Sequence, residues 1–147
     1  MIDRNASASK IATNMIKDDQ VFRLLGARLV KISKGKATVS LKISAEHTNV
    51  HGFCHGGIIF CLADATFGFA CNSENIKSVA QHCNITYISP IKVGENLLAH
   101  ARRVKEYGRS GIYDVKIQNS SGELVAIFHG YSKQILGIRK GVKINHF

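Results

Sequence analysis

The residue with the clearest chemical potential is Asp64, a carboxylate in the middle of an otherwise apolar segment. Leu62 and Ala63 precede it, and Ala65 and Phe67 follow it closely. A lone carboxylate in such surroundings costs free energy unless a hydrogen bond or a partner compensates it. Because burial perturbs the pKa of a carboxylate, residues of this kind mark candidate sites, where they act as general bases or nucleophiles. A structural carboxylate, hydrogen-bonded to a loop or a partner chain, is the alternative.

The second feature that could do chemistry is His55-Gly56-Gly57, which begins the same apolar segment. The first turn of a helix carries N–H groups without intrahelical partners and the positive end of the helix dipole. Two glycines leave these N–H groups accessible because no side chains cover them. The turn could therefore bind an anion, or hold a carbonyl oxygen in an oxyanion hole. A tight entry turn or close packing would also explain the glycine pair.

The spacing between these two features limits how they can cooperate. Gly57 and Asp64 are seven residues apart, which is about two helical turns and places both on one face. Along the axis they are about 10 Å apart, whereas reacting groups must approach to about 3–3.5 Å. Either the two features are unrelated, or two chains pair about a two-fold axis. In a pair of that kind, Asp64 of one chain can approach the Gly56 region of the other.

The segments around these residues predict an α+β fold with a mostly antiparallel sheet. A short amphipathic helix is predicted at about 6–18, and a long helix that is apolar on nearly all sides at 56–71. Period-2 alternation between turns predicts six strands, at 28–33, 36–43, 79–88, 96–105, 112–118 and 124–133. Because most strands follow one another at hairpin spacing, we expect a sheet wrapped around the long central helix.

Length and composition are typical of one ordinary globular domain over residues 1–147. Apolar residues make up 45% of the chain and charged residues 20%, which excludes a disordered protein. No apolar stretch reaches the roughly 20 residues of a membrane-spanning helix, and residues 1–19 lack the apolar core of a secretory signal. We therefore expect a cytoplasmic protein with no membrane partner and with a basic tail at about 137–147.

The positive charge does not by itself identify a partner. Twenty Lys and Arg against ten Asp and Glu give a net charge of +10. The basic residues are scattered and match no nucleic-acid-binding motif, so no nucleic-acid partner is expected. The four cysteines form no CxxC pair and are expected to be reduced and mostly buried; they are Cys54, Cys61, Cys71 and Cys83. Without paired Cys and His ligands, the sequence predicts no metal site. No bound cofactor is expected either.

The segment 49–64, NVHGFCHGGIIFCLAD, resembles the signature of hotdog-fold acyl-CoA thioesterases, and most closely the PaaI-like branch that serves phenylacetic acid degradation. ITYI at 85–88 and GIYDVKI at 111–117 are similar to the same family. The resemblance covers nearly the whole chain. It implies a hotdog fold and a homodimer with shared active sites that assembles into a tetramer. It also implies hydrolysis of an acyl-CoA thioester, with a phenylacetyl or hydroxyphenylacetyl group as the expected acyl group.

The resemblance further implies roles for individual residues. Gly56 would donate its backbone N–H to the thioester oxygen, and Asp64 of the partner subunit would be nucleophile or general base. Asn49 would position the water or the thioester. Related thioesterases carry a hydroxyl residue on the strand after the helix, and the comparable position here is His82. Three residues are expected to support the helix start or the substrate: Gly57, His55 and His82.

An acyl-CoA substrate would account for part of the positive charge, since CoA carries a 3′-phosphate and a pyrophosphate. Each candidate phosphate ligand could equally be a solvated surface charge; these candidates are Arg102, Arg103, Lys105, Arg109 and Lys133. Two other functions are compatible with the fold. A hydratase or dehydratase of acyl thioesters would require a proton-transfer pair, usually with a histidine. A non-catalytic acyl-CoA-binding module would not require Asp64.

Overall fold

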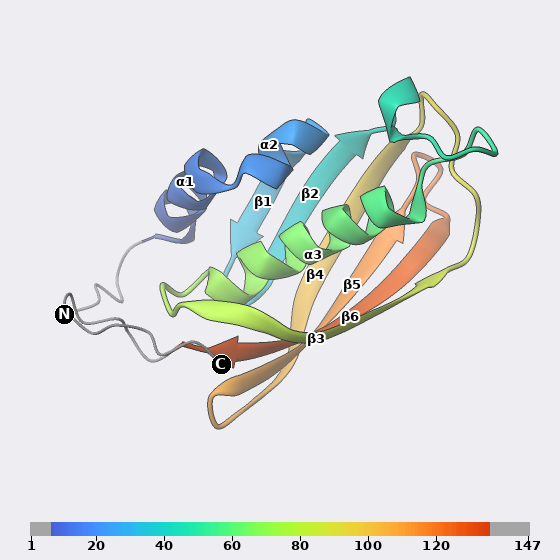
Figure 1. Ribbon diagram of the computed structural model, residues 1–147. Coiled ribbons are helices and arrows are strands. Elements are labelled where there is room, and N and C mark those ends of the chain that lie inside the picture. Colours follow the sequence, from blue (N-terminus) through green and yellow to red (C-terminus); the bar gives the residue numbers. More distant parts are fainter. Residues whose placement is uncertain (1–6, 136–147) are drawn as a thin grey trace.

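The alternating apolar residues pair into one six-stranded antiparallel sheet in the computed structural model, which describes residues 7–135 (Figure 1). The order across the sheet is β1-β2-β4-β5-β6-β3. The strands are β1 (Arg28–Ser33), β2 (Lys36–Lys42), β3 (Ser78–Tyr87), β4 (Asn96–Tyr107), β5 (Ser110–Gln118) and β6 (Leu124–Gln134). The predicted antiparallel sheet is confirmed, with strand ends that differ from the prediction by no more than two residues.

Short helices precede the sheet and one long helix crosses it. The helices are α1 (Ala8–Asp18), α2 (Gln20–Leu25), the 3-10 turn η1 (Ala45–His47) and α3 (Gly56–Asn72). The sequence predicts α1 and α3 but shows α2 only as an apolar patch, because six residues are too few to display helical periodicity. Asp19 caps α2 by accepting a hydrogen bond from the Phe22 N–H (2.9 Å). The predicted start of the first helix at 6 and the basic tail at 137–147 lie outside the described residues.

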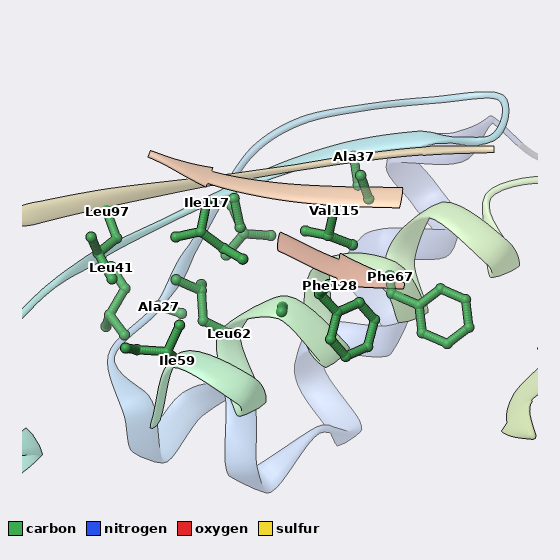
Figure 2. Packing of buried hydrophobic residues seen from close by; sticks show 14 of the residues in the cluster. Ala27, Ala37, Leu41, Ile59, Leu62, Phe67, Leu97, Val115, Ile117 and Phe128 are labelled. Atoms are coloured by element: carbon green, nitrogen blue, oxygen red, sulfur yellow. The ribbon is translucent and has the colours of Figure 1, made fainter. Parts of the chain in front are cut away.

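Helix α3 is apolar because it packs along the sheet on one side and against α2 on another (Figure 1). Figure 2 shows Ile59 and Leu62 of α3 facing Leu41, Leu97 and Ile117 of the sheet. Leu62, Leu97 and Ile117 have no exposed surface at all. Burying each such side chain contributes about 1.5–3 kcal/mol relative to leaving it in water. This contact therefore determines where the functional groups of α3 can lie.

The last residue of α3 ties the helix to the strand that follows. The Asn72 side-chain NH2 donates to the Gly68 and Ser78 carbonyl oxygens (3.0 and 3.1 Å). Its Oδ1 accepts from the Ser78 N–H (2.9 Å). These bonds satisfy carbonyl and amide groups that a helix end would otherwise leave unpaired. They also set the start of β3 relative to α3.

Strand β3 lies at one edge of the sheet. It pairs with β6 on one side, and no other strand in residues 7–135 pairs with its second side. An edge strand of ten residues presents a row of free N–H and C=O groups that can template pairing with another chain. The face of β3 that points to α3 carries Cys83 and Ile85, both partly buried.

Gly130 on β6 lies directly against the Phe67 side chain of α3. A Cβ atom at this position would lie 2.8 Å from the Cδ2 and Cε2 atoms of Phe67. The Phe67 ring is itself fixed between Tyr113 and Phe128, with ring centroids 5.4 and 5.9 Å away. A glycine at this position therefore lets the aromatic cluster sit directly on the strand.

We expect Gly130→Ala to lower the free energy of unfolding by about 1–3 kcal/mol, the usual cost of forcing extra volume into a packed core. The measurement is equilibrium denaturation in urea. Phe67→Leu combined with Gly130→Ala should recover part of the loss. An undiminished stability of Gly130→Ala alone would contradict this account.

Candidate active site

The start of α3 presents one backbone N–H group without a partner. His55 is the N-cap, and its ring Nδ1 accepts a hydrogen bond from the Gly57 N–H (2.9 Å). The Ile58 and Ile59 N–H groups donate to the His55 carbonyl oxygen (2.9 and 3.3 Å). Within residues 7–135, the Gly56 N–H donates no hydrogen bond. The capping pattern thus leaves the Gly56 amide available to an external oxygen at the positive end of the helix dipole.

Tyr87 at the end of β3 holds this glycine in place. Its hydroxyl donates a hydrogen bond to the Gly56 carbonyl oxygen (2.8 Å). A Cβ at position 56 would lie 3.1 Å from the Tyr87 Cζ and Oη atoms, so the glycine permits the close approach. The sequence by itself gave Tyr87 no role at the start of α3. The tyrosine at the strand end gives no sequence signal for this contact, because the contact joins residues 31 positions apart.

The loop before α3 orients Asn49. The Asn49 Oδ1 accepts from the His51 and Phe53 N–H groups (2.9 and 3.2 Å). These two backbone donors require the oxygen on the loop side, so the side-chain NH2 is turned away from it. No partner of that NH2 lies within the part of the chain that the structure describes. It is therefore free to donate to a water or to a substrate oxygen.

Asp64 lies in the third turn of α3 and is half-buried. Its Oδ1 is 3.9 Å from the Cys83 Sγ, which donates a weak hydrogen bond from β3. Burial raises the pKa of the Asp64 carboxyl above its ordinary value, the Cys83 bond lowers it in part, and the charge of Asp19 raises it. A carboxylate with a raised pKa is a stronger base than an exposed one.

The strand residue that touches Asp64 is Cys83, one position along from the predicted His82. Successive side chains of a strand point to opposite faces, and Cys83 takes the face toward α3. His82 is exposed, with its ring 5.4 Å from the Tyr131 ring. The structure records no contact between His82 and Asp64 within residues 7–135. The sequence did not point to Cys83, because a β-bulge between Ala80 and His82 shifts the register of β3. This shift decides which side chains of β3 face α3.

The cysteines near the site are poor nucleophiles. Burial raises the pKa of Cys54 and Cys83 to about 11 and that of Cys71 to about 12, with the Asp64 charge adding to the shift of the last two. Burial and then Asp64 also raise the pKa of Cys61. A thiol with so high a pKa carries little thiolate near neutral pH. The cysteines are therefore weaker candidates for a nucleophile than the Asp64 carboxylate.

The five basic residues predicted to bind CoA phosphates do not form one cluster. Arg102 and Arg103 are neighbours on β4 and so point to opposite faces. Arg102 lies beside Asp114 (3.4 Å), whereas Arg103 pairs with Glu74 and Glu106 and is only 21% exposed. The Lys133 Nζ is 3.3 Å from the Ser110 Oγ. Lys105 and Arg109 are exposed near the turn between β4 and β5.

An open stripe of α3 runs past Asp64. Gly57, Cys61, Asp64 and Gly68 follow one another at spacings of three or four residues and are half-buried or exposed, so they line one side of the helix. Apart from Asp64, the side chains of this stripe are small. The Cys83 contact shows that the stripe faces the edge strand β3. The stripe and the edge strand β3 therefore lie on the same side of the chain.

No metal site or membrane span accompanies this geometry in the described part. Within residues 7–135, no three His, Cys, Asp or Glu side chains are grouped so as to hold a metal ion. Among the described helices, none is long and apolar enough to cross a membrane.

A curved antiparallel sheet around a helix, with a free amide at the helix start and a carboxylate on the same helix, defines the class of hotdog-fold thioesterases. The model of the Thioesterase superfamily matches residues 51–126. The chain belongs to this superfamily, and the expected α+β hotdog fold is confirmed.

Individual relatives support the same conclusion. The chain is 35% identical to the acyl-coenzyme A thioesterase PaaI of Escherichia coli over 127 residues, 86% of this chain and 91% of the relative. The structure of E. coli PaaI, from the phenylacetic acid degradation operon, matches with a TM-score of 0.86 over 88% of this chain and 94% of that one. Human acyl-coenzyme A thioesterase 13 is 32% identical over 130 residues, 86% of this chain and 93% of the relative.

The pH dependence of thioester hydrolysis should report the Asp64–Cys83 contact. The basic form of Asp64 is lost as the pH falls through the raised pKa of its carboxyl. Activity should therefore decline at a higher pH than it would if Asp64 had the ordinary aspartate pKa of about 3.9. Cys83→Ala removes a bond that stabilises the carboxylate, so the acidic limb of the kcat/KM profile should move to higher pH. Cys83→Ser should move it back, and Cys54→Ala, in the loop, should leave it unchanged. If the acidic limb stays in place in Cys83→Ala, or moves to lower pH, the contact between Asp64 and Cys83 does not stabilise the carboxylate.

Proposed function

We propose that this protein hydrolyses acyl-CoA thioesters to a free acid and CoA. The observation that carries the proposal is the free Gly56 amide at the start of the helix that also bears half-buried Asp64. The relatives support it: two are named acyl-coenzyme A thioesterases. A further solved structure, of Streptococcus mutans smu.793, is bound to acetyl CoA and matches with a TM-score of 0.72 and 28% identity over 74% of this chain and 88% of that one.

The mechanism follows from the charges that develop during hydrolysis. As water or a carboxylate attacks the thioester carbon, negative charge accumulates on the carbonyl oxygen, and the Gly56 N–H donates to it. One donor of this kind is typically worth about 10²–10³ in rate. As a general base, Asp64 takes a proton from the attacking water; the tetrahedral intermediate then breaks its C–S bond, and the CoA sulfur leaves with that proton. As a nucleophile, Asp64 attacks the carbonyl carbon and expels CoA, and the mixed anhydride that remains is cleaved by a water to the free acid. The Asn49 NH2 orients the water or the thioester, while His55 and Gly57 keep the helix start in shape.

The two halves of the site come from different chains in this proposal. Gly56 and Asp64 are separated by about 12 Å along one helix axis at about 1.5 Å per residue, which is too far for one thioester to touch both. The open stripe of α3 and the free edge of β3 lie side by side and fit a two-fold copy of the same surface. Such a homodimer holds two sites, each with Gly56 of one subunit and Asp64 of the other, and a pair of dimers gives a tetramer.

The acyl group is proposed to be aromatic, of the phenylacetyl or hydroxyphenylacetyl type, as in aromatic acid catabolism. The source operon of the E. coli PaaI structure supports this choice. Of the aromatic residues on α3, Phe67 and Phe69 are only 1% exposed and belong to the core. Phe60 and Tyr87 stay partly accessible near the helix start and are the proposed contacts of an aromatic ring.

Hydrolysis on these lines needs water but no bound cofactor, because CoA is part of the substrate. Three of the predicted ligands for the CoA phosphates are exposed, namely Arg102, Lys105 and Arg109. A cytoplasmic location is proposed on the four free cysteines of the chain, which suit a reducing compartment.

Asp64→Asn should lower the rate of hydrolysis about 10²–10⁴-fold, the usual contribution of a general base. The measurement is thiol release from phenylacetyl-, hydroxyphenylacetyl- and straight-chain acyl-CoAs, with Asp18→Asn, the same change at an exposed aspartate on α1, as a folded control. A full rate in Asp64→Asn would refute the mechanism. Turnover of an enoyl-CoA without CoA release would favour a hydratase instead, and binding without any hydrolysis by the wild type would favour a binding module.

Gly56→Pro tests the amide itself. Proline removes the N–H but suits the first position of a helix, and His55 has φ −61° and ψ 134°, which a following proline allows. We expect a loss of about 10²–10³-fold in kcat. Gly56→Ala keeps the N–H while placing the same Cβ against Tyr87, so it should retain most of the rate. Equal losses in both variants would mean that packing, not the amide, matters here.

Mixed dimers test whether the site is shared. Chains with Asp64→Ala and chains with Gly56→Pro, each inactive alone, are unfolded together, mixed in equal amounts and refolded. Random pairing makes half of the dimers mixed, and each of these carries one intact site, so about a quarter of the wild-type activity should return. If no activity returns although native mass spectrometry detects mixed dimers, each site lies within one chain.

A further inference from the structure

The face of the sheet opposite α3 carries a pocket of about 440 Å³ that the thioesterase chemistry does not use. Its walls include Lys31, Lys36, Arg102 and Lys116, all exposed and from four different strands. The residues next to these cations along the strands, such as Ala37, Ala101 and Val115, are buried on the face that carries α3. Because strand side chains alternate between faces, these cations point away from the candidate active site. The volume lies in the range of small-ligand pockets, about 300–1,000 Å³.

The strand register arranges the pocket in two rows. One row runs Lys31, Thr38, His100, Lys116 across β1, β2, β4 and β5, each residue paired directly with the next. The second row, two residues further along the strands, runs Ser33, Lys36, Arg102, Asp114. At about 4.8 Å per strand, the lysines of the first row are about 14 Å apart at their Cα atoms. The hydroxyl of Thr38 and the ring of His100 lie between them, joined at 3.1 Å.

Two of these cations oppose each other directly. Lys36 on β2 and Arg102 on β4 are cross-strand partners, and like charges in that position destabilise a sheet. Of the residues that line the pocket, Asp114 is the one carboxylate. Its Oδ1 is engaged by His129 (2.8 Å) and its Oδ2 lies 3.4 Å from Arg102, which is 62% exposed. Four cations with one already occupied carboxylate leave a local excess of positive charge that a bound anion would neutralise.

We propose that this pocket binds a diphosphate, that is, an anion with two linked phosphoryl groups. Monodentate lysines at the two ends, with Lys36 and Arg102 beside them, fit several phosphate oxygens at once, and charge-assisted bonds of this type are the strong ones. The Thr38 hydroxyl and His100 supply further polar contacts on the pocket floor. The diphosphate has two sources, a free nucleotide or the ADP portion of CoA. Binding itself does not depend on the proposed hydrolysis.

The test uses inorganic pyrophosphate as the probe, titrated into the full-length protein by calorimetry at low and at physiological salt. Lys36→Gln combined with Lys116→Gln should weaken pyrophosphate binding at least tenfold. Lys17→Gln combined with Lys92→Gln, two exposed lysines outside the pocket, removes the same charge and should change the affinity less than twofold. Equal weakening in both double variants would overturn the proposal, because it would mean nonspecific attraction to net charge. If pyrophosphate binds the wild type no more tightly than sulfate does, the proposal is overturned as well.

Kinetics then separate the two sources of the diphosphate. A KM that rises in the pocket variant for an acyl-CoA, but not for the matching acyl-pantetheine, assigns the pocket to CoA. An unchanged KM for both, together with weakened pyrophosphate binding, assigns it to a free nucleotide. If the wild type binds pyrophosphate but hydrolyses no thioester, the diphosphate site is supported and the proposed thioesterase function is refuted. If pyrophosphate does not bind and the pocket variant instead changes the oligomeric state in sedimentation, the face is a contact between copies of the chain, and the proposal fails.

Discussion

The packing of α3 against the sheet is the contact on which the other features of this protein depend. Leu62, with no exposed surface, and Phe67, at 1%, hold the helix against the strands, and Gly130 allows the close approach. A helix fixed in this way can present a free amide at its start and a carboxylate two turns later without losing its position. The apolar contact therefore does the work of preorganisation, because neither group has to be ordered when the substrate arrives.

The same packing explains the electrostatics of the carboxylate. Asp64 lies on the boundary between the buried face of α3 and the open stripe, so it is desolvated enough for its pKa to rise but remains reachable. Cys83 supplies a weak donor, and the high pKa of that thiol keeps the proton on sulfur. A stronger donor or a nearby cation would stabilise the carboxylate and make it a weaker base. Burial against the apolar wall, only partly offset by this weak donor, keeps the pKa of Asp64 above its ordinary value.

The sheet separates two kinds of chemistry. Its inner face is apolar and carries α3, whereas its outer face carries cations in register across four strands. Alternation along each strand makes this division automatic, since a buried residue on one face is followed by a polar residue on the other. The net charge of +10 is thus partly a property of one surface, and the basic residues singled out from sequence are divided between surfaces rather than gathered.

Periodicity in the sequence was enough to predict the six strands, the long apolar helix and the α+β class, because these depend on the local alternation of apolar residues. The His55-Gly56-Gly57 start and Asp64 could also be identified, since a helix start and a carboxylate among apolar residues are local signals. Only the tertiary structure decided that Cys83 rather than His82 touches Asp64, that Tyr87 holds Gly56, and that Lys36 and Arg102 lie side by side. These contacts depend on strand register and on a β-bulge, which are set by packing between residues far apart in the chain and leave no pattern in the local sequence.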